Sequence, residues 1–540
     1  MNYDTIIIGG GIGGLTAGAV LAKKGKKVLL LEQHIMVGGA ATIFKRKNIN
    51  VEVGLHEMDF GEEGFDSKRD LFKFLEIEKK VELVSLPQTW RLRTDGHDYT
   101  IPEGIENAKA YFIEQFPEEK NGIETYFNKM KSMCYTMGKL PNDMNFFEFL
   151  IYPIVKLPRI IAAYLNQKSV GEELDNLIKN DTLKRLLNIN LTYYHDNPYK
   201  FSWYYHALAQ YNYYNCAKFI KGGSGALSEA LADIIKENGG TVLVRCDVQK
   251  INVENGKATG VTYLNKKTKE TVAVNGDYVV ANCAPNLVYD VMLDEKYRDN
   301  SIANYKESVS LFSVYIIFKD NLVNIYNDNT YSTFVPAENS YNEPFKEMNN
   351  TEKYLDVKDR SFVLVNYGAI DSGLTIEKDD KRTLGVFCGA SYLDEWESLS
   401  KEEYINKKEE LAQKLFERIE KYFPNIKDHV EYYEVSTPKT IKRYMKTPSG
   451  TAYGFVNESF LRKGRLKRFS PTVKNLVFSG AYAFPGGGFT GALVSGYLAA
   501  LNIIEPQKKY IFKRTLLVTA VCTAVSTAYK WVPAILSLLK

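Results

Sequence analysis

A glycine-rich turn between an apolar strand and a helix limits the fold of this chain more than any other feature. Residues 5–8 form a β-branched run that is typical of a buried parallel strand. GGGIGG follows at 9–14, with the spacing G-x-G-x-x-G. A helix is expected over 15–24, and a second strand ends at Glu32. The order strand, glycines, helix, strand and acid predicts a βαβ unit that binds a dinucleotide.

Each part of this unit has a physical role. The glycines let the main chain approach a pyrophosphate closely, and the helix N-terminus presents free amides to it. The Glu32 carboxylate is expected to accept hydrogen bonds from ribose hydroxyls and to repel a 2′-phosphate. The alternative, a tight turn without a ligand, is disfavoured by the complete pattern. The predicted cofactor contacts in this turn are Gly9, Gly11, Ile12, Gly13 and Gly14.

A second glycine pair follows shortly after Glu32 and favours FAD over NAD. Simple NAD domains do not need a second close approach of the main chain, whereas a longer dinucleotide does. The stretch resembles the FAD superfamily of amine oxidases, phytoene desaturases and Rab GDP-dissociation inhibitors. Besides Glu32, the contacts predicted here are Gln33, Gly38, Gly39, Ala40 and Ala41.

Two later segments complete the predicted cofactor domain. Residues 219–261 read as turn, helix, strand, turn and strand, and the superfamily resemblance implies that Val248 contacts the adenine through its main chain. Residues 475–500 read as a strand, a glycine-rich loop and a helix that begins near 490. The helix N-terminus directs positive charge at the loop and would favour an anionic reduced flavin ring. The contacts predicted here are Gly480, Gly488, Phe489 and Thr490.

These segments predict an α/β fold: a Rossmann-like FAD-binding domain of the glutathione-reductase or amine-oxidase type, with a second α+β substrate domain. The cofactor domain is discontinuous, with pieces 1–105, 215–295 and 435–505. The substrate domain takes 106–214, which has a helical pattern, and 296–434, which has three strand runs and a helix. Its antiparallel sheet is expected to cover the flavin. Residues 506–540 form a basic and apolar tail.

Composition excludes several other classes. The chain has 69 Lys and Arg against 65 Asp and Glu, a net charge of +4 that is too balanced for a general nucleic-acid binder. Its six cysteines are widely spaced without a C-x-x-C pair, so no zinc site is expected and a reducing compartment is favoured. His195 and His206 lack metal-ligand spacing, and no metal is predicted. The N-terminus does not resemble a secretory signal.

A closer resemblance rests on four segments: EQHIMVGGAATIF from Glu32, NVEVGLHEMDFG from Asn50, residues 437–454, and PGGGFTGALVSGYLAA from Pro485. They resemble the retinol saturase, carotenoid isomerase and phytoene desaturase family of FAD-dependent oxidoreductases, and cover about half of the chain. The resemblance implies hydride and proton transfer at carbon–carbon double bonds of an apolar polyene, retinoid- or carotenoid-like. A retinol-saturase-like reduction is the leading expectation, and cis–trans isomerisation or phytoene-type desaturation is the alternative.

His56 and Glu57 are the candidate proton donors beside the ring. The family has an aromatic residue where Glu57 follows His56 here, which bears on substrate and reaction direction. The alternative for His56 is a hydrogen bond to the main chain near the flavin. Tyr444 and Lys446 are weaker candidates, with a solvated basic strand as the alternative. An amine oxidase and a non-catalytic prenyl carrier are the rival classes, and the intact cofactor motifs argue against the carrier.

An apolar substrate also suggests contact with a membrane. Residues 146–165 are apolar but interrupted, and form either an interfacial lip or a core helix pair. The aromatic stretch 193–215 lines a tunnel or a wet surface. Residues 508–514 are basic and 515–529 carry no charge, so a membrane surface or a single C-terminal membrane segment is the expected partner. The catalytic domain is then membrane-associated and cytoplasmic. The electron donor or acceptor is not specified by the sequence.

Overall fold

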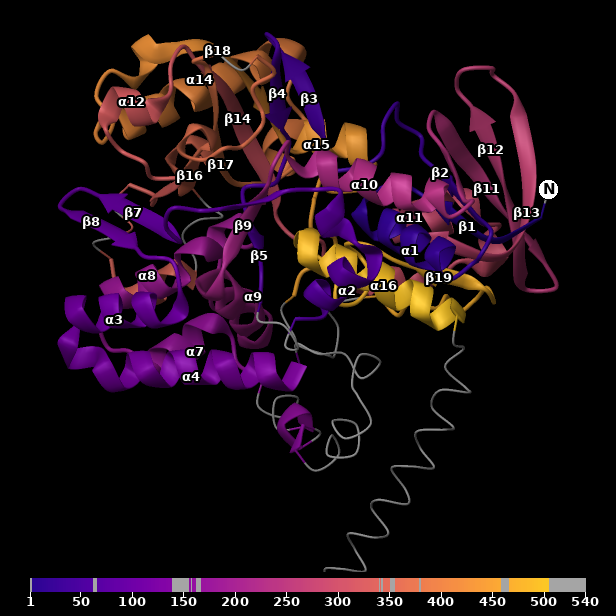
Figure 1. Ribbon diagram of the computed structural model, residues 1–540, viewed down its shortest axis with the longest axis horizontal. Coiled ribbons are helices and arrows are strands. Elements are labelled where there is room, and N and C mark those ends of the chain that lie inside the picture. The colour runs from indigo at the N-terminus through magenta and orange to yellow at the C-terminus, as the bar shows by residue number, and fades with distance from the viewer. Residues whose placement is uncertain are drawn as a thin grey trace, which may run out of the picture.

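The computed structural model describes residues 2–61, 66–137, 155–156, 158–161, 167–338, 340, 343–349, 355–377, 380–457 and 466–504. The predicted tail 506–540 and most of the stretch 146–165 lie outside these residues. Figure 1 shows three regions: a sheet with helices on the right, a second sheet at the upper left, and a helical region below it. Among the described residues, no helix is both long enough and apolar enough to cross a membrane.

The first sheet has the strand order β10-β2-β1-β13-β12-β11, and β19 pairs with β13. Its parallel centre comes from both ends and the middle of the chain: β1 (Asn2–Ile8), β2 (Val28–Leu31), β10 (Thr241–Leu243), β13 (Thr271–Ala281) and β19 (Leu476–Phe478). The antiparallel strands β11 (Cys246–Glu254) and β12 (Lys257–Asn265) extend it. β2 and the last three residues of β1 are apolar and buried because both faces of a parallel sheet are covered.

Three helices pack together on this sheet: α1 (Ile12–Lys23), α10 (Ser224–Glu237) and α16 (Gly488–Ile504). α1 begins at Ile12, three residues earlier than the glycine pattern suggested. A Cβ on Gly496 would lie 2.1 Å from the carbonyl oxygen of Gly13, so only glycine permits the observed approach of α16 to α1. This contact fixes the C-terminal helix against the first glycine turn.

The second sheet has the order β18-β14-β17-β16-β15-β7-β8. Its strands are β7 (Trp90–Thr94), β8 (His97–Ile101), β14 (Ser310–Phe318), β15 (Ser332–Val335), β16 (Phe362–Asn366), β17 (Thr383–Ser391) and β18 (Val430–Ser436). β7 and β8 fall within the piece 1–105 that the sequence assigned to the cofactor domain. They belong to the second sheet instead, because β7 pairs in parallel with β15.

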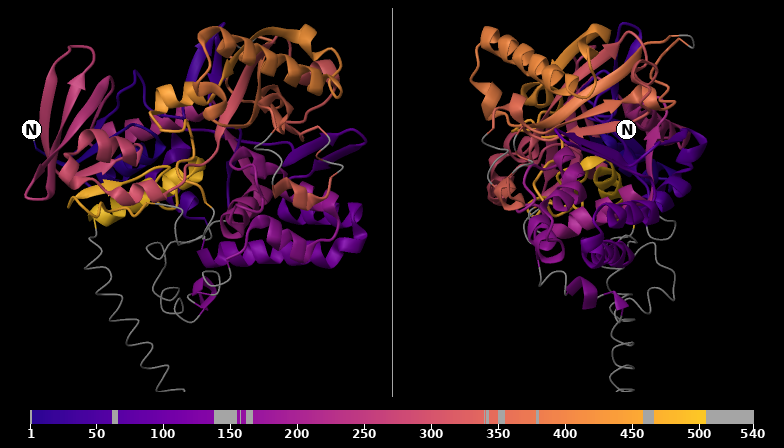
Figure 2. Two further views of the ribbon diagram at one scale, coloured as in Figure 1. Left: turned by 180° about the vertical axis from the view of Figure 1, so that it is seen from behind. Right: turned by 90° about the vertical axis from the view of Figure 1, so that its left-hand side faces the viewer.

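Helices cover the second sheet and form the third region (Figure 2). α14 (Lys401–Glu420) packs on the second sheet, where the rings of Phe416 and Phe387 meet edge to face at 5.2 Å. α12 (Leu322–Tyr326) and α13 (Asp394–Glu397) are short helices of this region. The helical region consists of α3 (Ile105–Gln115), α4 (Lys120–Met137), α7 (Val170–Leu177), α8 (Asp181–Asn188) and α9 (Trp203–Asn215).

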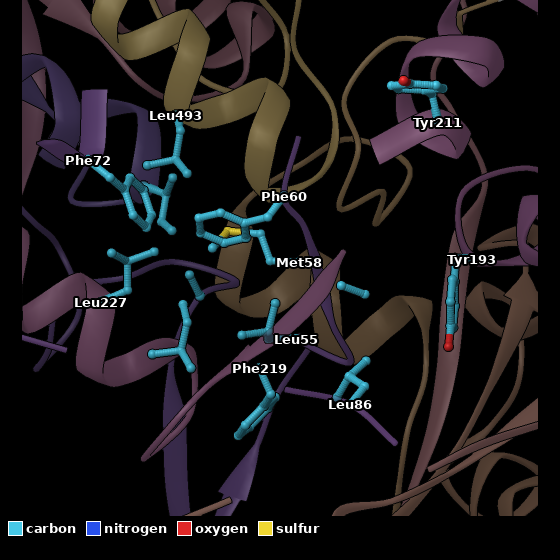
Figure 3. Close-up of a cluster of buried hydrophobic side chains, with 14 of the residues drawn as sticks. Leu55, Met58, Phe60, Phe72, Leu86, Tyr193, Tyr211, Phe219, Leu227 and Leu493 are labelled. Atoms are coloured by element: carbon cyan, nitrogen blue, oxygen red, sulfur yellow. The ribbon is translucent and has the colours of Figure 1, made fainter. Parts of the chain in front are cut away.

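Short elements connect the three regions. β3 (Ile43–Arg46) and β4 (Ile49–Glu52) form a hairpin, and β9 (Ala217–Ile220) pairs with β5 (Met58–Asp59) and β6 (Leu83–Ser85). Further helices are α2 (Ser67–Leu75), α11 (Pro285–Leu287) and α15 (Pro438–Met445). Figure 3 shows Met58 and Phe60 beside Phe72 and Leu493 of α2 and α16, so the chain around β5 crosses the main apolar core.

Candidate active site

One cavity of about 1740 Å³ runs along the loops that follow β1, β2, β13 and β19. These loops meet because the carboxyl ends of parallel strands lie at the same edge of a sheet. Pockets for small ligands usually measure roughly 300–1,000 Å³. The cavity is therefore large enough for a dinucleotide together with a second long ligand.

The glycine turn is built against the second glycine pair. Gly11 caps the N-terminus of α1 and forms an isolated β-bridge with Gly38. The Gly38 amide donates to the Gly10 carbonyl at 2.7 Å. Gly38 has φ +115° and its Cβ would lie 2.1 Å from the Ala41 carbonyl oxygen, so no other residue fits there. Two glycine turns thus share one cradle, which suits the close approach of main chain to a pyrophosphate.

Glu32 braces this cradle from the end of β2. Its carboxylate accepts hydrogen bonds from the amides of Gly10 and His34, both at 2.7 Å. Its side chain is buried and lines the cavity. Glu32 therefore holds the glycine turn in place, and it also faces the position expected for a ribose.

The start of β11 lies beside Glu32, because the Cys246 amide donates to the Glu32 carbonyl at 2.7 Å. Val248, two residues on, lines the same end of the cavity. The ammonium of Lys446 lies 3.1 Å from the Asp247 carboxylate, and the ring of Tyr444 meets that of His34 at 5.7 Å. Tyr444 and Lys446 therefore sit at the Glu32 and Val248 end, and not beside His56 and Glu57 as candidate proton donors should.

Asn282 joins the first and last cofactor segments, and the sequence analysis did not single it out. Its side-chain amide donates to the Gly9 carbonyl at 3.3 Å, and its side-chain oxygen accepts from the Ser479 hydroxyl at 3.4 Å. A Cβ on Gly13 would lie 2.6 Å from the Cα of Gly480 beside it. The available signal was a polar residue directly after a buried strand that pairs with β1.

A buried ionic cluster lies at the N-terminus of α16, and it too was missed. The fully buried Lys68 ammonium lies 3.1 Å from the Asp59 carboxylate and 3.5 Å from that of Asp66. It also donates to the Thr490 hydroxyl at 3.0 Å, and that hydroxyl donates to Asp59 at 2.5 Å. Burial of three charges is tolerated because each is paired. The cluster holds Thr490, in the first turn of α16, against the cavity wall.

Glu57 and His56 line the cavity where the second sheet covers it. Among the described residues, the Glu57 carboxyl receives hydrogen bonds from the hydroxyls of Tyr193 and Ser332, both at 3.5 Å. Burial raises the pKa of Glu57 to about 8, against the smaller opposing effect of these hydroxyls. Burial lowers the pKa of His56 to about 4. At neutral pH this wall therefore presents an uncharged acid beside an uncharged imidazole.

Aromatic side chains surround this pair. The His56 ring stacks on Tyr193 with centroids 5.2 Å apart, and its Nδ1 is buried without a partner among the described residues. Tyr213 and Tyr453 are half-buried in the same wall. The cavity continues past apolar side chains of the helical region, which are Met137, Ile160, Phe201 and Leu208. This part of the cavity suits an apolar ligand.

The structure brings all but one of the predicted site residues to this cavity. Gly14 is the exception: it lies in α1, and a Cβ there would be 2.3 Å from the Gly9 carbonyl oxygen. The cavity-lining residues among those predicted are Gly9, Gly11, Ile12, Gly13, Glu32, Gln33, Gly38, Gly39, Ala40, Ala41, His56, Glu57, Val248, Gly480, Gly488, Phe489 and Thr490. Their roles in binding and catalysis stay predictions. Within the described ranges, no group of three or more His, Cys, Asp or Glu residues is arranged to hold a metal ion.

The sequence has relatives along nearly its whole length. All-trans-retinol 13,14-reductase of Danio rerio is 26% identical, over 92% of this chain and 85% of the relative. Prolycopene isomerase of Daucus carota is 27% identical, over 93% and 80%. Among solved structures, cyclohexylamine oxidase from Brevibacterium oxydans shares the fold, with a TM-score of 0.57 at 16% identity over 94% of this chain and 100% of that one.

A family model also matches the chain, over residues 12–504. That range begins within the first glycine turn and includes the second glycine pair, the His56 and Glu57 wall, and the whole of α16. The family described by the model has a flavin as its cofactor, in keeping with the cradle at Gly11 and Gly38. The chain therefore belongs to the family of flavin-containing amine oxidoreductases and is an oxidoreductase with the Rossmann-like fold of that family.

Proposed function

We propose that this protein is an FAD-dependent oxidoreductase that acts on a carbon–carbon double bond of an apolar polyene, retinoid- or carotenoid-like. The observation that carries the proposal is the uncharged Glu57 acid in an aromatic wall, at the point where the apolar part of the cavity begins. The relatives named for retinol reduction and prolycopene isomerisation support the same substrate class.

FAD is the flavin that the cavity fits best. The glycine turns would hold the pyrophosphate at the N-terminus of α1, and Glu32 would hold the ribose. Val248, beside Glu32, would contact the adenine at the end of the cavity opposite His56 and Glu57. An FMN-sized ligand would leave the Glu32 and Val248 end without a partner. When bound, FAD supplies hydride transfer to or from carbon.

The side chains around Glu57 supply the proton and the dry surroundings. Glu57 keeps its proton at neutral pH and delivers it from its carboxyl group to a substrate carbon, so that hydride and proton together add across one double bond. The uncharged His56 ring and Tyr193 form the flat wall against which a conjugated chain lies. The aromatic wall excludes water. This keeps the Glu57 carboxyl protonated and gives the apolar substrate an apolar environment.

Anaerobic turnover tests the proposal. The holoprotein, reduced with dithionite, is mixed with all-trans-retinol and with a poly-cis carotene, the oxidised holoprotein is mixed with a long-chain amine, and the products are analysed by mass. A gain of two hydrogens shows saturation, and an unchanged mass with a new retention time shows isomerisation. The oxidised holoprotein with a saturated precursor tests desaturation. Turnover of the amine alone, by the oxidised protein, would overturn the proposal in favour of an amine oxidase.

We propose in addition that the apolar substrate reaches the cavity from a membrane surface, with the catalytic domain on the cytoplasmic side. The support is the sequence of the tail, in which four basic residues occur at 508–514 and an uncharged stretch follows at 515–529. Cell fractionation tests this. The full chain should stay in the membrane fraction at high salt, and a chain that ends at Gln507 should be released. A full-length protein found wholly in the supernatant would contradict it.

A further inference from the structure

The chain between β4 and β5 carries both His56 and Glu57. These residues, 53–57, are here called the acid-bearing segment. They form neither helix nor strand. A segment of irregular main chain needs hydrogen-bond partners from elsewhere in the fold. Those partners come from the second sheet and from the Glu52 carboxylate at the end of β4.

Three tyrosines of the second sheet donate to carbonyls of this segment. The Tyr315 hydroxyl donates to the Val53 carbonyl at 2.9 Å, and the Tyr367 hydroxyl donates to the Leu55 carbonyl at 2.8 Å. The Tyr331 hydroxyl donates to the carbonyl of His56 itself. The tyrosines lie in β14, just before β15 and just after β16.

The cofactor domain holds the amides of the same segment. The Glu52 carboxylate accepts hydrogen bonds from Gly54 and Leu55, at 3.0 and 2.8 Å. It also accepts from the Ser224 amide at 2.6 Å, at the N-terminus of α10. The amides of the acid-bearing segment are thus linked to α10 through Glu52, and its carbonyls are bonded to tyrosines of the second sheet.

The three phenols are well suited to fix a position. Tyr331 and Tyr367 are each 1% exposed, and their rings meet edge to face at 5.9 Å. Tyr315 is also buried, and its ring packs edge to face on Phe44 at 5.4 Å. Because the rings cannot turn away from their neighbours, each hydroxyl has a defined direction.

We propose that Tyr315, Tyr331 and Tyr367 are positioning residues that hold the acid-bearing segment, and with it Glu57, at a fixed place on the cavity wall. The hydroxyls act through main-chain carbonyls, and Tyr315 also lines the cavity beside His56 and Glu57. This inference rests on the proposed role of Glu57 as the acid. It adds that the second sheet sets where that acid stands.

The proton of Glu57 should depend on this arrangement. The titratable groups that face Glu57 are phenols, those of Tyr193, Tyr213, Tyr331 and Tyr367, and the imidazole of His56 precedes it in the chain. Burial is the largest cause of its raised pKa. A segment that moves outward lets water reach the carboxyl, and the pKa then falls towards its ordinary value.

Hydrogen exchange tests whether the tyrosines hold the acid-bearing segment, and it needs no substrate. The FAD-loaded Tyr331→Phe and Tyr367→Phe proteins keep both rings and lose one hydroxyl each. We expect amide exchange in a peptide covering 53–58 to rise at least tenfold in each variant. Tyr126→Phe is the matched control, because Tyr126 is fully buried and donates to the Leu187 carbonyl at 3.1 Å, away from the segment.

Infrared spectroscopy of the same holoproteins gives the readout that a merely structural role would not move. The carboxyl band that disappears in Glu57→Gln identifies Glu57. Its titration midpoint should fall by about one pH unit or more in Tyr331→Phe and stay in place in Tyr126→Phe. Unchanged exchange and an unchanged midpoint in both Tyr331→Phe and Tyr367→Phe would overturn the inference. Full turnover in Glu57→Gln would instead overturn the acid role, whatever the exchange result.

Discussion

The carboxylate of Glu32 accepts a 2.7 Å hydrogen bond from the main-chain amide of Gly10, 22 residues earlier in the chain. A second bond from the His34 amide fixes its other oxygen. The acid expected to bind a ribose therefore also holds the turn expected to bind the pyrophosphate. Loss of Glu32 should harm both halves of the cofactor site.

Two substitutions of Glu32 distinguish the contribution of its negative charge from that of its side-chain shape. Glu32→Ala removes two charge-assisted hydrogen bonds, one from the buried Gly10 amide and one from the partly buried His34 amide, each worth roughly 1.5–3 kcal/mol. We expect flavin affinity to fall by a hundredfold or more in Glu32→Ala and by less in Glu32→Gln. The measurement is flavin titration of the apoprotein, followed by absorbance. Equal affinity in Glu32→Ala and the unaltered protein would contradict the role of this acid.

Gly11→Val should abolish flavin binding. A Cβ at Gly11 would already lie 2.9 Å from Nδ2 of Asn282, and the valine methyls would enter the cradle shared with Gly38. The flavin-to-protein absorbance ratio of the purified protein measures the loss. Gly54→Ala is the matched control, because its Cβ would make only an ordinary 3.6 Å contact with the Ala40 carbonyl oxygen. A yellow Gly11→Val protein would refute the cradle.

Glu57 should set the pH dependence of the protonation step. Its pKa, raised to about 8 by burial, keeps it protonated below that pH. The rate in single turnover should therefore be level through neutral pH and fall about tenfold per unit well above pH 8. The rate of Glu57→Gln should be lower by about a hundredfold or more, and its fall above pH 8 should be absent. If the rate of Glu57→Gln still falls above pH 8, that fall is due to the titration of another group.

The raised pKa of Glu57 also makes the free energy of unfolding depend on pH. The folded protein binds a proton at Glu57 that the unfolded chain has lost above its ordinary pKa near 4.5. This group therefore reduces the free energy of unfolding progressively as pH rises from about 4.5 to about 8. Denaturation at several pH values should show a shallower decline over that window in Glu57→Gln. An identical decline would show that Glu57 is ionised in the folded protein.

His56 should act as an uncharged group. Burial lowers its pKa to about 4, so it contributes no charge change between pH 5 and 8. His56→Ala removes the ring stacked on Tyr193 and should slow the protonation step about tenfold or more, with normal flavin content. Stopped-flow turnover of the reduced protein measures this. An unchanged rate would remove His56 from the mechanism and leave the fold unaffected.

Lys68→Met should destabilise the protein strongly. It leaves the buried carboxylates of Asp59 and Asp66 without their cation, and the loss of one partner of a buried pair costs roughly 3–5 kcal/mol. The melting temperature of the holoprotein measures the effect. Lys80→Met is the control, since its pair with Glu237 is solvent-exposed and worth roughly 0–1 kcal/mol. Equal melting temperatures would show that the cluster is not held by charge.

The parts of the site that could be predicted are those whose chemistry is local in the chain. The glycine turn at 9–14, the acid at 32 and the glycine loop before α16 each follow from residue spacing within one strand–turn–helix unit. The pair His56 and Glu57 came from a family resemblance in a single short segment. In all of these the neighbours in sequence are also the neighbours in space.

The parts that were missed depend on contacts between distant segments. β7 and β8 join the second sheet because β7 pairs with β15, more than two hundred residues later. In the sequence, Lys68 looks like an ordinary helix lysine, because its contact with Thr490 exists only in the folded chain. Asn282 becomes a site residue only where β13 lies against β1.

The sequence by itself determined that the chain has a dinucleotide turn, an acid to face it and a glycine-rich helix start, because local spacing sets main-chain geometry. Only the tertiary structure decided that Glu57 is uncharged. A carboxyl takes its pKa from what surrounds it, and the surroundings of Glu57 come from Tyr193 in the helical region and Ser332 in the second sheet. No spacing within residues 53–57 encodes that burial.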